Sequence, residues 1–302
     1  MVKREIAVRL LSNDTEKVSL LARDSFLYRM GYKLLTQWLI DNKYPIHIYL
    51  ELSRSCNYSC QMCARNKIED KSGFMRADTL LKVLKEMKPY PTSYALHMFG
   101  EPLLHPLYYD MIRSIRVVNK QNNIILVTNG SMDMRDLAGL VDRIYVSVPH
   151  MVPGMYYKMT GGGDLSNVHK NVIEFIKMNT KTKLLVRYFG PDITEVLSWK
   201  KEGVQFEFKE FHNYAGAAKE WTNLKSKGNV YPCYHHFYTL AITYDGDIRI
   251  CCADWTGDTS LGKVKDTTIQ EAWKKGLGKH FDLCDKCDIW QYKTNMFFKW
   301  QH

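Results

Sequence analysis

The sequence has no run of about 20 uncharged apolar residues, the length that a helix needs to cross a membrane. No apolar core of a secretion signal follows residues 1–5. Low-complexity segments and convincing internal repeats are also missing. These absences argue against a membrane-spanning, secreted or repeat protein. They predict a cytoplasmic globular chain, and its 302 residues can bury a large core.

No dense basic run accounts for the net charge of +10, and no stripe alternates basic with aromatic residues. We therefore expect solvated surface lysines rather than a nucleic-acid site. An acidic redox partner or a phosphorylated substrate remains compatible with the charge.

Disulfides are not expected for the eight cysteines of a cytosolic chain, whose clustered spacing favours metal binding. Cys56, Cys60 and Cys63 follow residues 47–52, an apolar stretch that predicts a strand. Three thiolates on a [4Fe–4S] cube leave one iron open to a substrate or cofactor. A zinc ion would need a fourth ligand, and none is local. The spacing thus favours a reactive cluster at a strand's carboxyl end, with zinc or three buried thiols as alternatives.

Apolar strand patterns alternate with helical patterns from residue 46 onward. The predicted strands are 46–53, 94–100, 123–129, 142–148, 183–189 and 204–210. The predicted helices between them are 77–88, 107–119, 166–178 and 194–202. This order implies an α/β fold with a parallel sheet and crossover helices. Residues 24–42 predict an additional amphipathic helix.

Small and polar residues stand at the ends of the second, third and fourth predicted strands. They are Gly100, Glu101, Pro102, Thr128, Asn129 and Ser147. A glycine lets a ligand approach the backbone, and a carboxylate accepts hydrogen bonds from an amino group. Hydroxyl and amide groups can bind ribose hydroxyls, although ordinary turn chemistry would use the same residues.

Arg187 lies within the fifth predicted strand, where an arginine among apolar residues needs a partner. That partner is either a ligand carboxylate or a neighbouring acid such as Glu207. The residues alone do not decide between the two. The glycines of residues 161–163 do not follow a strand, so they predict a tight loop and no dinucleotide fingerprint.

A second cysteine set follows residue 211, where the alternation stops. Its members are Cys233, Cys251, Cys284 and Cys287, enough to close an iron–sulfur or a zinc site. Residues 240–244 and 247–250 predict a hairpin that brings Cys251 near Cys233, and a helix is expected from 268 to about 277. Cys252 is left over, either as a small buried side chain or as a thiol near the cluster.

The two cysteine sets and the Gly-Glu-Pro element together resemble the radical S-adenosylmethionine (SAM) superfamily with a C-terminal twitch domain, a shortened SPASM domain. The resemblance implies a partial (β/α)6 TIM-like barrel at 46–215, a small α+β cluster domain at 216–302 and an N-terminal extension at 1–45. It further implies two [4Fe–4S] clusters, one bound to SAM and one auxiliary.

In that family the open iron chelates SAM, which is cleaved to methionine and a hydrogen-abstracting 5′-deoxyadenosyl radical. By resemblance, Cys56, Cys60 and Cys63 hold the catalytic cluster and Glu101 holds the amino group of SAM. Further SAM contacts are implied for Tyr58, Met62, Gly100, Pro102, Thr128, Asn129, Ser147 and Arg187. Met62 stands where the family usually has an aromatic residue.

The arrangement resembles the inosamine dehydrogenase of butirosin biosynthesis, which implies oxidation of a small biosynthetic intermediate. Alternatives are a peptide maturase, an epimerase with Cys252 as hydrogen donor, and a non-enzymatic iron–sulfur electron carrier. The resemblance also implies a flavodoxin- or ferredoxin-type electron donor. Neither a membrane nor a nucleic acid is an expected partner.

Overall fold

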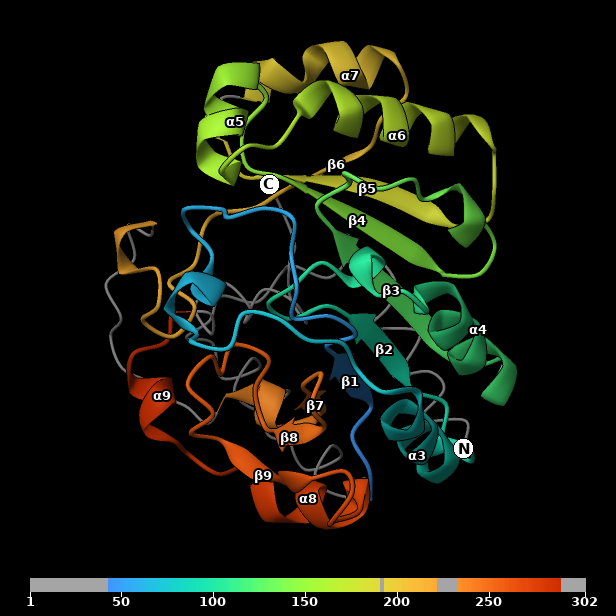
Figure 1. Cartoon of the computed structure of the whole chain (residues 1–302), viewed down its shortest axis with the longest axis vertical. Coiled ribbons are helices and arrows are strands. Elements are labelled where there is room, and N and C mark those ends of the chain that lie inside the picture. Colours follow the sequence, from blue (N-terminus) through green and yellow to red (C-terminus); the bar gives the residue numbers. More distant parts are fainter. Residues whose placement is uncertain (1–42, 191–192, 222–232, 289–302) are drawn as a thin grey trace, which may run out of the picture.

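The computed structural model describes residues 43–190, 193–221 and 233–288. Its nine strands form one sheet in the order β6-β5-β4-β3-β2-β1-β7-β8-β9. The strands are β1 His47–Leu50, β2 Ser93–Leu96, β3 Asn123–Thr128, β4 Arg143–Val148, β5 Lys183–Tyr188, β6 Phe206–Phe208, β7 Thr239–Ile242, β8 Asp247–Arg249 and β9 Ser260–Lys263. Figure 1 shows this sheet running through the whole molecule.

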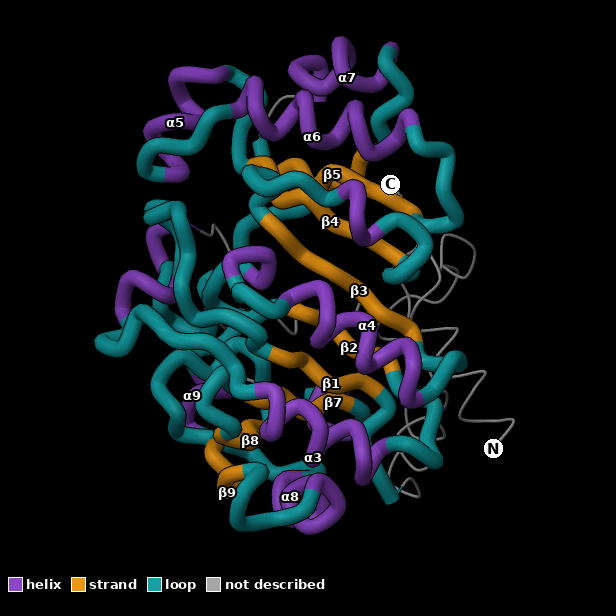
Figure 2. Tube along the Cα trace, turned by 45° about the vertical axis from the view of Figure 1, so that its right-hand side comes forward, coloured by secondary structure: helices purple, strands orange, loops and turns teal. Residues whose placement is uncertain are grey.

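Strands β1 to β6 are all parallel to their neighbours, which confirms the predicted α/β architecture of a partial barrel. The helices are α3 Ala77–Met87, α4 Tyr108–Val118, α5 Pro153–Thr160, α6 Leu165–Lys177, α7 Leu197–Lys201, α8 Ile269–Gly276 and α9 Asp282–Asp285. Crossover helices α3, α4, α6 and α7 lie along the outer side of the curved sheet (Figures 1 and 2). This layering follows from right-handed strand–helix–strand connections.

Several predicted elements differ from the structure in extent. No helix was predicted where α5 lies, and Gly161 ends this helix in a left-handed conformation. The helix expected at 194–202 is a 3-10 turn, Ile193–Val196, followed by the short α7. Strand β9 and helix α9 had no recognised sequence pattern. The helix expected at 24–42 lies outside the described residues.

The predicted hairpin is confirmed, since β7 and β8 pair antiparallel at Ala241 and Arg249. Its attachment was not foreseen, because β7 also pairs in parallel with β1, with Ile48 opposite Leu240. The sheet therefore continues from the barrel strands into the C-terminal cysteine region. The proposed boundary at residues 215 and 216 remains a prediction, and one hydrogen-bonded sheet spans it.

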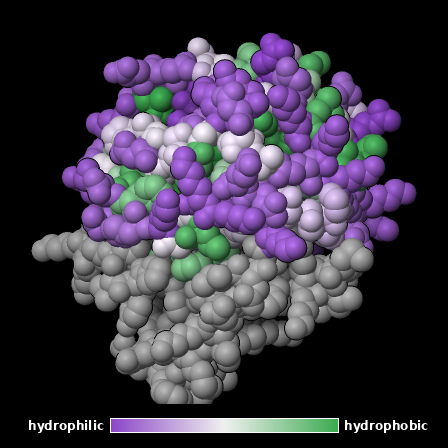
Figure 3. Space-filling model, turned by 90° about the horizontal axis from the view of Figure 1, so that it is seen from below, coloured by the Kyte–Doolittle hydropathy of each residue, from purple (hydrophilic) through white to green (hydrophobic). Residues whose placement is uncertain are grey.

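The core is continuous on the helix side of the sheet. Strand β1 is buried along its whole length, and β3 alternates between buried and half-buried residues. The apolar faces of α3 and α4 pack against it through residues such as Val83 and Ile112. Hydrophilic residues cover most of the described surface visible in Figure 3. No helix among the described segments combines the length and apolar character that crossing a membrane requires.

Candidate active site and second cysteine site

The first cysteine loop leaves β1 and is held against the end of α5 by its backbone. Ser59 N donates to Thr160 O at 3.0 Å, and Gln61 N donates to Met159 O at 2.9 Å. At Gly161, which has a φ of +68°, a Cβ atom would lie 2.2 Å from Ser59 Oγ. Glycine is therefore required there for both conformation and close approach.

A buried ion pair anchors the beginning of the same loop. Arg54 Nε and Nη2 donate to the two carboxylate oxygens of Glu51 at 2.6 and 2.7 Å. Glu51 also accepts a hydrogen bond from Tyr244 N, which ties the loop to the turn between β7 and β8. The signal in the sequence was a charged residue, Glu51, inside an otherwise apolar stretch.

The Gly-Glu-Pro element after β2 packs directly on this loop. A Cβ atom at Gly100 would lie 2.1 Å from Ser53 O, so no other residue fits without moving the backbone. Glu101 N donates to Ser55 O at 2.9 Å. Pro102 then begins a 3-10 turn, Pro102–Leu104. Two segments about forty residues apart in sequence are thus joined just before Cys56.

Glu101 is buried, and its carboxylate collects donors from two strand ends. It accepts hydrogen bonds from Leu103 N, Thr128 Oγ1 and Asn129 N at 3.1, 2.8 and 2.7 Å. Burial raises the pKa of Glu101 to about 7 against these donors. Within the described residues no cation pairs with it. The carboxylate has a remaining acceptor position, so an amino group of a ligand fits its chemistry.

Asn129 connects this carboxylate to the cysteine loop. Its backbone N–H binds Glu101, while its Nδ2 lies 2.8 Å from Asn57 Oδ1 and 4.0 Å from Cys56 Sγ. Thr128 behaves differently from the predicted ribose contact, since its hydroxyl donates to Glu101 and accepts from Gly130 N. A role for Thr128 toward SAM stays a prediction, and its observed role is to hold Glu101.

The three cysteines of the first loop form no disulfide and lie close enough to affect one another's pKa. Burial raises the pKa of Cys56 and Cys63, and burial with the charges of Cys63 and Cys56 raises the pKa of Cys60 to about 12. Three negatively charged thiolates that are buried together need a compensating positive charge, which iron ions supply. The donor set therefore fits an iron–sulfur cluster with three protein ligands.

Among the described residues, no three His, Cys, Asp or Glu side chains converge at the spacing of one bound metal ion. Ligands of a four-iron cube each bind a different iron. The cysteines of such a site do not have to meet at one point.

The remaining predicted SAM contacts surround the same strand ends. Tyr58 packs edge-on against Tyr156 at 6.4 Å between ring centroids, and Met62 is buried. Ser147 lies on β4 directly opposite Arg187 on β5. Arg187 donates from Nε to Glu207 at 2.7 Å and stacks on Tyr145 at 3.5 Å. Of the two partners that the sequence left open, the structure shows the acid. A contact with SAM remains a prediction.

The second cysteine set comes from three segments: Cys233 precedes the 3-10 turn Tyr234–Phe237, Cys251 follows β8, and Cys284 and Cys287 lie on and just after α9. A hydrogen bond with Cys252 and burial raise the pKa of Cys251, and the charges of Cys252, Cys287 and Cys233 add to the rise. The effect of the Cys233 charge on Cys251 agrees with the predicted proximity of these two residues. Cys284 on α9 is buried, with its Sγ 3.9 Å from Nε2 of His236.

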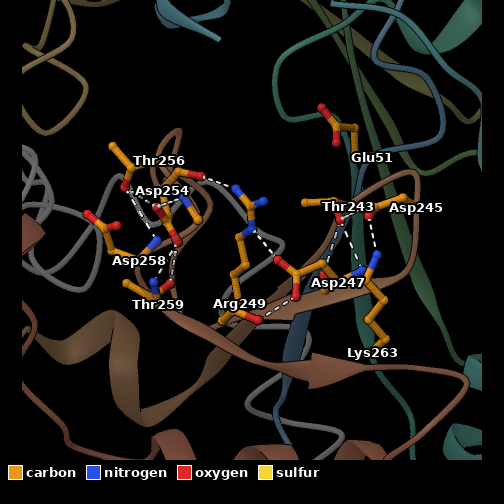
Figure 4. A network of polar contacts seen from close by, with 12 residues as sticks. Glu51, Thr243, Asp245, Asp247, Arg249, Asp254, Thr256, Asp258, Thr259 and Lys263 are labelled. Atoms are coloured by element: carbon orange, nitrogen blue, oxygen red, sulfur yellow. Dashed lines mark hydrogen bonds and ion pairs between the residues drawn. The ribbon is translucent and has the colours of Figure 1, made fainter. Parts of the chain in front are cut away.

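A polar network fixes the backbone on both sides of Cys251 and Cys252 (Figure 4). Arg249 donates to the Asp247 carboxylate at 2.8 Å and to Asp254 O at 2.6 Å. The buried Asp254 carboxylate accepts from the hydroxyl groups of Thr256 and Thr259 at 2.9 and 2.8 Å. The two cysteines therefore sit on a rigid connection between β8 and the following loop.

Cys252 faces the barrel side of this connection. It packs against the buried cluster of Tyr49 on β1, Ala95 and Ala241, against which Met98 also packs. Burial raises the pKa of Tyr49, and the charge of Cys252 and a hydrogen bond with it add to the rise. The unassigned thiol of the sequence thus lies beside barrel strands, next to the auxiliary set.

Tyr214 was not singled out in the sequence, where it follows the end of the strand–helix alternation at residue 211. It packs against a buried cluster that includes Ala64, next to Cys63, and Phe99, next to Gly100. Burial raises the pKa of its phenol, as do the charges of Cys63, Cys252 and Cys60, whereas Arg187 lowers it. In the described part of the chain, no group hydrogen-bonds to its hydroxyl. No local pattern marks this residue.

The backbone that carries Tyr214 is strained and clamped. Tyr214 and Ala215 have φ values of +45° and +51°, in the left-handed region. Asn213 N donates to both carboxylate oxygens of the buried Asp288 at 2.9 Å, and Asn213 Nδ2 donates to Lys286 O at 2.8 Å. The clamp ties the barrel exit to the residues around Cys287.

Comparisons with known proteins agree with this site. The radical SAM superfamily model matches residues 50–195, and the SPASM iron–sulfur cluster-binding domain model matches residues 233–290. By these matches, residues 50–195 form a radical SAM domain and residues 233–290 a SPASM-type domain. The cofactors of the chain are therefore SAM, a SAM-binding [4Fe–4S] cluster and an auxiliary iron–sulfur cluster.

Curated relatives include the tungsten-containing aldehyde ferredoxin oxidoreductase cofactor-modifying protein of Pyrococcus furiosus, 30% identical over 149 residues, which are 47% of this chain and 38% of the relative. The GTP 3′,8-cyclase of Helicobacter pylori is 26% identical over 203 residues, 63% of each chain. The chain spans about half or less of the length of the first curated relatives, with coverage of 38% and 50%.

Solved structures share the fold at low identity. BtrN in complex with AdoMet and 2-DOIA has a TM-score of 0.57 at 16% identity, covering 80% of this chain and 92% of that one. Streptococcus suis SuiB bound to the precursor peptide SuiA has a TM-score of 0.65 at 13% identity, covering 96% and 82%.

Proposed function

We propose that this radical SAM enzyme oxidises a small biosynthetic intermediate by removing two hydrogens. The observation that carries the proposal is the second cysteine set, in which four thiols suffice to close an auxiliary cluster beside the barrel. A cluster without a vacant iron is suited to moving electrons and not to binding substrate. When bound, the SAM-ligated cluster supplies hydrogen abstraction and the auxiliary cluster supplies a one-electron acceptor.

The chain's own residues divide the remaining work. In the proposal, Cys56, Cys60 and Cys63 hold the catalytic cluster, and Glu101 accepts a hydrogen bond from the amino group of SAM. Asn129 fixes the position of Glu101 relative to the cysteine loop through hydrogen bonds to Glu101 and Asn57. Cys233, Cys251, Cys284 and Cys287 hold the auxiliary cluster. The likeness to BtrN supports a small substrate, whereas the likeness to SuiB with its bound precursor peptide supports a peptide.

One feature favours a second outcome, in which a hydrogen returns to the substrate, as in an epimerase. Cys252 is a thiol on the barrel side, beside Tyr49 and Met98. A thiol can donate a hydrogen atom to a carbon radical. Oxidation and hydrogen return are therefore two alternative outcomes at the same site. They differ in whether the reacting carbon of the product has lost its hydrogen or has regained one. In either case we propose a flavodoxin- or ferredoxin-type protein as the electron donor.

Oxidation predicts a defined mass balance with a small secondary alcohol that carries deuterium at the alcohol carbon. One deuterium should appear in 5′-deoxyadenosine, and the product should be lighter by the deuterium and one hydrogen. Mass spectrometry of both products measures this, with a boiled enzyme as the blank. A product that keeps its oxidation state and gains a solvent hydrogen at that carbon, and that disappears in Cys252→Ala, would refute oxidation.

We further propose that the Tyr214 hydroxyl binds a polar group of the substrate. Its support is a phenol that forms no hydrogen bond with any described residue and lies close to Cys63, Cys252, Cys60 and Arg187. Because the phenol's pKa is raised, it stays protonated and acts as a donor.

Tyr214→Phe should lower substrate-dependent product formation about fivefold, since one hydrogen bond contributes about 1 kcal/mol. SAM cleavage without substrate, followed by chromatography of 5′-deoxyadenosine, should remain at the wild-type rate. An equal fall in both rates would show that Tyr214 supports the fold or the SAM site instead.

A further inference from the structure

We propose that His236 is an alternative metal ligand at the Cys284 position of the auxiliary cluster, so that this iron can be held by sulfur or by nitrogen. The inference rests on the proposed assignment of Cys233, Cys251 and Cys287 as ligands. It goes beyond that assignment by adding a nitrogen donor, which the cysteine spacing did not reveal.

The first support is where the imidazole is held. Cys233 precedes a single 3-10 turn, Tyr234–Phe237, and His236 N donates to Cys233 O at 3.0 Å. The Cys-x2-His spacing therefore brings both side chains to the same turn. His236 is only 3% exposed, and its ring packs edge-on against Phe281 at 6.1 Å. This is a metal-ligand spacing on a fixed element.

The second support is the orientation of the ring. Its Nδ1 lies 2.8 Å from Lys279 O, and because a carbonyl can only accept, Nδ1 carries the hydrogen. The neutral ring therefore presents a lone pair at Nε2. A histidine whose other nitrogen donates to a backbone carbonyl is the usual arrangement of a metal-binding imidazole.

The third support is the distance to Cys284. Nε2 lies 3.9 Å from Cys284 Sγ. Sulfur and nitrogen ligands of one tetrahedral ion, at bond lengths of about 2.3 and 2.1 Å, are separated by about 3.6 Å. The two atoms are thus close enough for either one to reach the same iron. Cys284 N also donates to Phe281 O at 2.8 Å. The short stretch from Lys279 to Cys284 therefore holds both the imidazole ring and the thiol.

The test compares iron content and nitrogen coupling in full-length variants reconstituted anaerobically. Wild type should contain about eight irons per chain, from two four-iron clusters. Cys284→Ala should keep about eight, because His236 replaces the lost thiolate. Cys287→Ala, from the same Cys-x2-Cys pair, is the control and should lose about four irons.

Pulsed EPR of the reduced protein without SAM should show a strong ¹⁴N coupling in Cys284→Ala that is absent from the double variant with His236→Ala. The auxiliary reduction potential of Cys284→Ala should also rise, since a neutral imidazole replaces an anionic thiolate. Cys284→Ser, which preserves side-chain shape, repeats the measurement should the alanine variant misfold.

The wild-type count tests the auxiliary-cluster assignment separately, because about four irons in wild type would remove that assignment whatever the variants show. With wild type at about eight, a loss of about four irons in both Cys284 variants would overturn the role of His236. Retained iron without nitrogen coupling would also overturn it.

Discussion

Replacing Cys56, Cys60 and Cys63 together with alanine is expected to abolish formation of 5′-deoxyadenosine from SAM. Without these thiols no protein ligand remains for the cluster that reduces SAM. The fold should survive, because the loop is held by Ser59 and Gln61 backbone bonds and not by its sulfurs. Chromatography after anaerobic incubation with SAM and dithionite measures the loss.

The same variant should keep about four irons, since the auxiliary ligands are separate. Cys252→Ala is the matched control, as it removes a thiol near both sites without removing a proposed cluster ligand, and it should still cleave SAM. Continued 5′-deoxyadenosine formation by the triple variant would show that these cysteines do not hold the catalytic cluster.

Glu101→Gln should weaken SAM binding by roughly ten- to a hundred-fold while leaving the iron content unchanged. A hydrogen bond to a buried charged group contributes about 1.5–3 kcal/mol, which corresponds to that range. Equilibrium binding to the reconstituted protein measures it. Thr128→Val is the control, because it removes a bond to Glu101 and retains the carboxylate, so its effect should be smaller.

The ratio of the two dissociation constants, variant to wild type, should also depend on pH. Burial raises the pKa of Glu101 to about 7, so the carboxylate is charged above that pH and protonated below it. The advantage of wild type over Glu101→Gln should therefore be full near pH 8 and shrink as the pH falls below 7. A ratio close to one at every pH would remove Glu101 from the SAM site.

The chemistry of the site could be predicted from the sequence because it is encoded locally. Cys56, Cys60 and Cys63 lie within eight residues, and their spacing alone suggests a cluster with an open iron. Gly100 and Glu101 stand directly after a recognisable strand. The parallel sheet was also predictable, since apolar strand patterns and amphipathic helix patterns alternate along the chain.

The partners of these residues were not predictable, because they come from distant parts of the sequence. Whether Arg187 pairs with Glu207 depends on β5 lying beside β6. Thr128 donates a hydrogen bond to Glu101 across neighbouring strand ends, a contact that no local pattern indicates.

The sequence by itself determined that this protein carries two cysteine sites and an α/β barrel core, because spacing and periodicity are local properties. The tertiary structure alone decided how those parts are joined. Pairing of β1 with β7 continues one sheet across nearly two hundred residues of chain, and the Asn213–Asp288 clamp holds Tyr214 near Cys63, Cys252 and Cys60. His236 could be proposed as a metal ligand only from the folded structure, because its two ring nitrogens face Lys279 O and Cys284 Sγ, which lie far from it in the sequence.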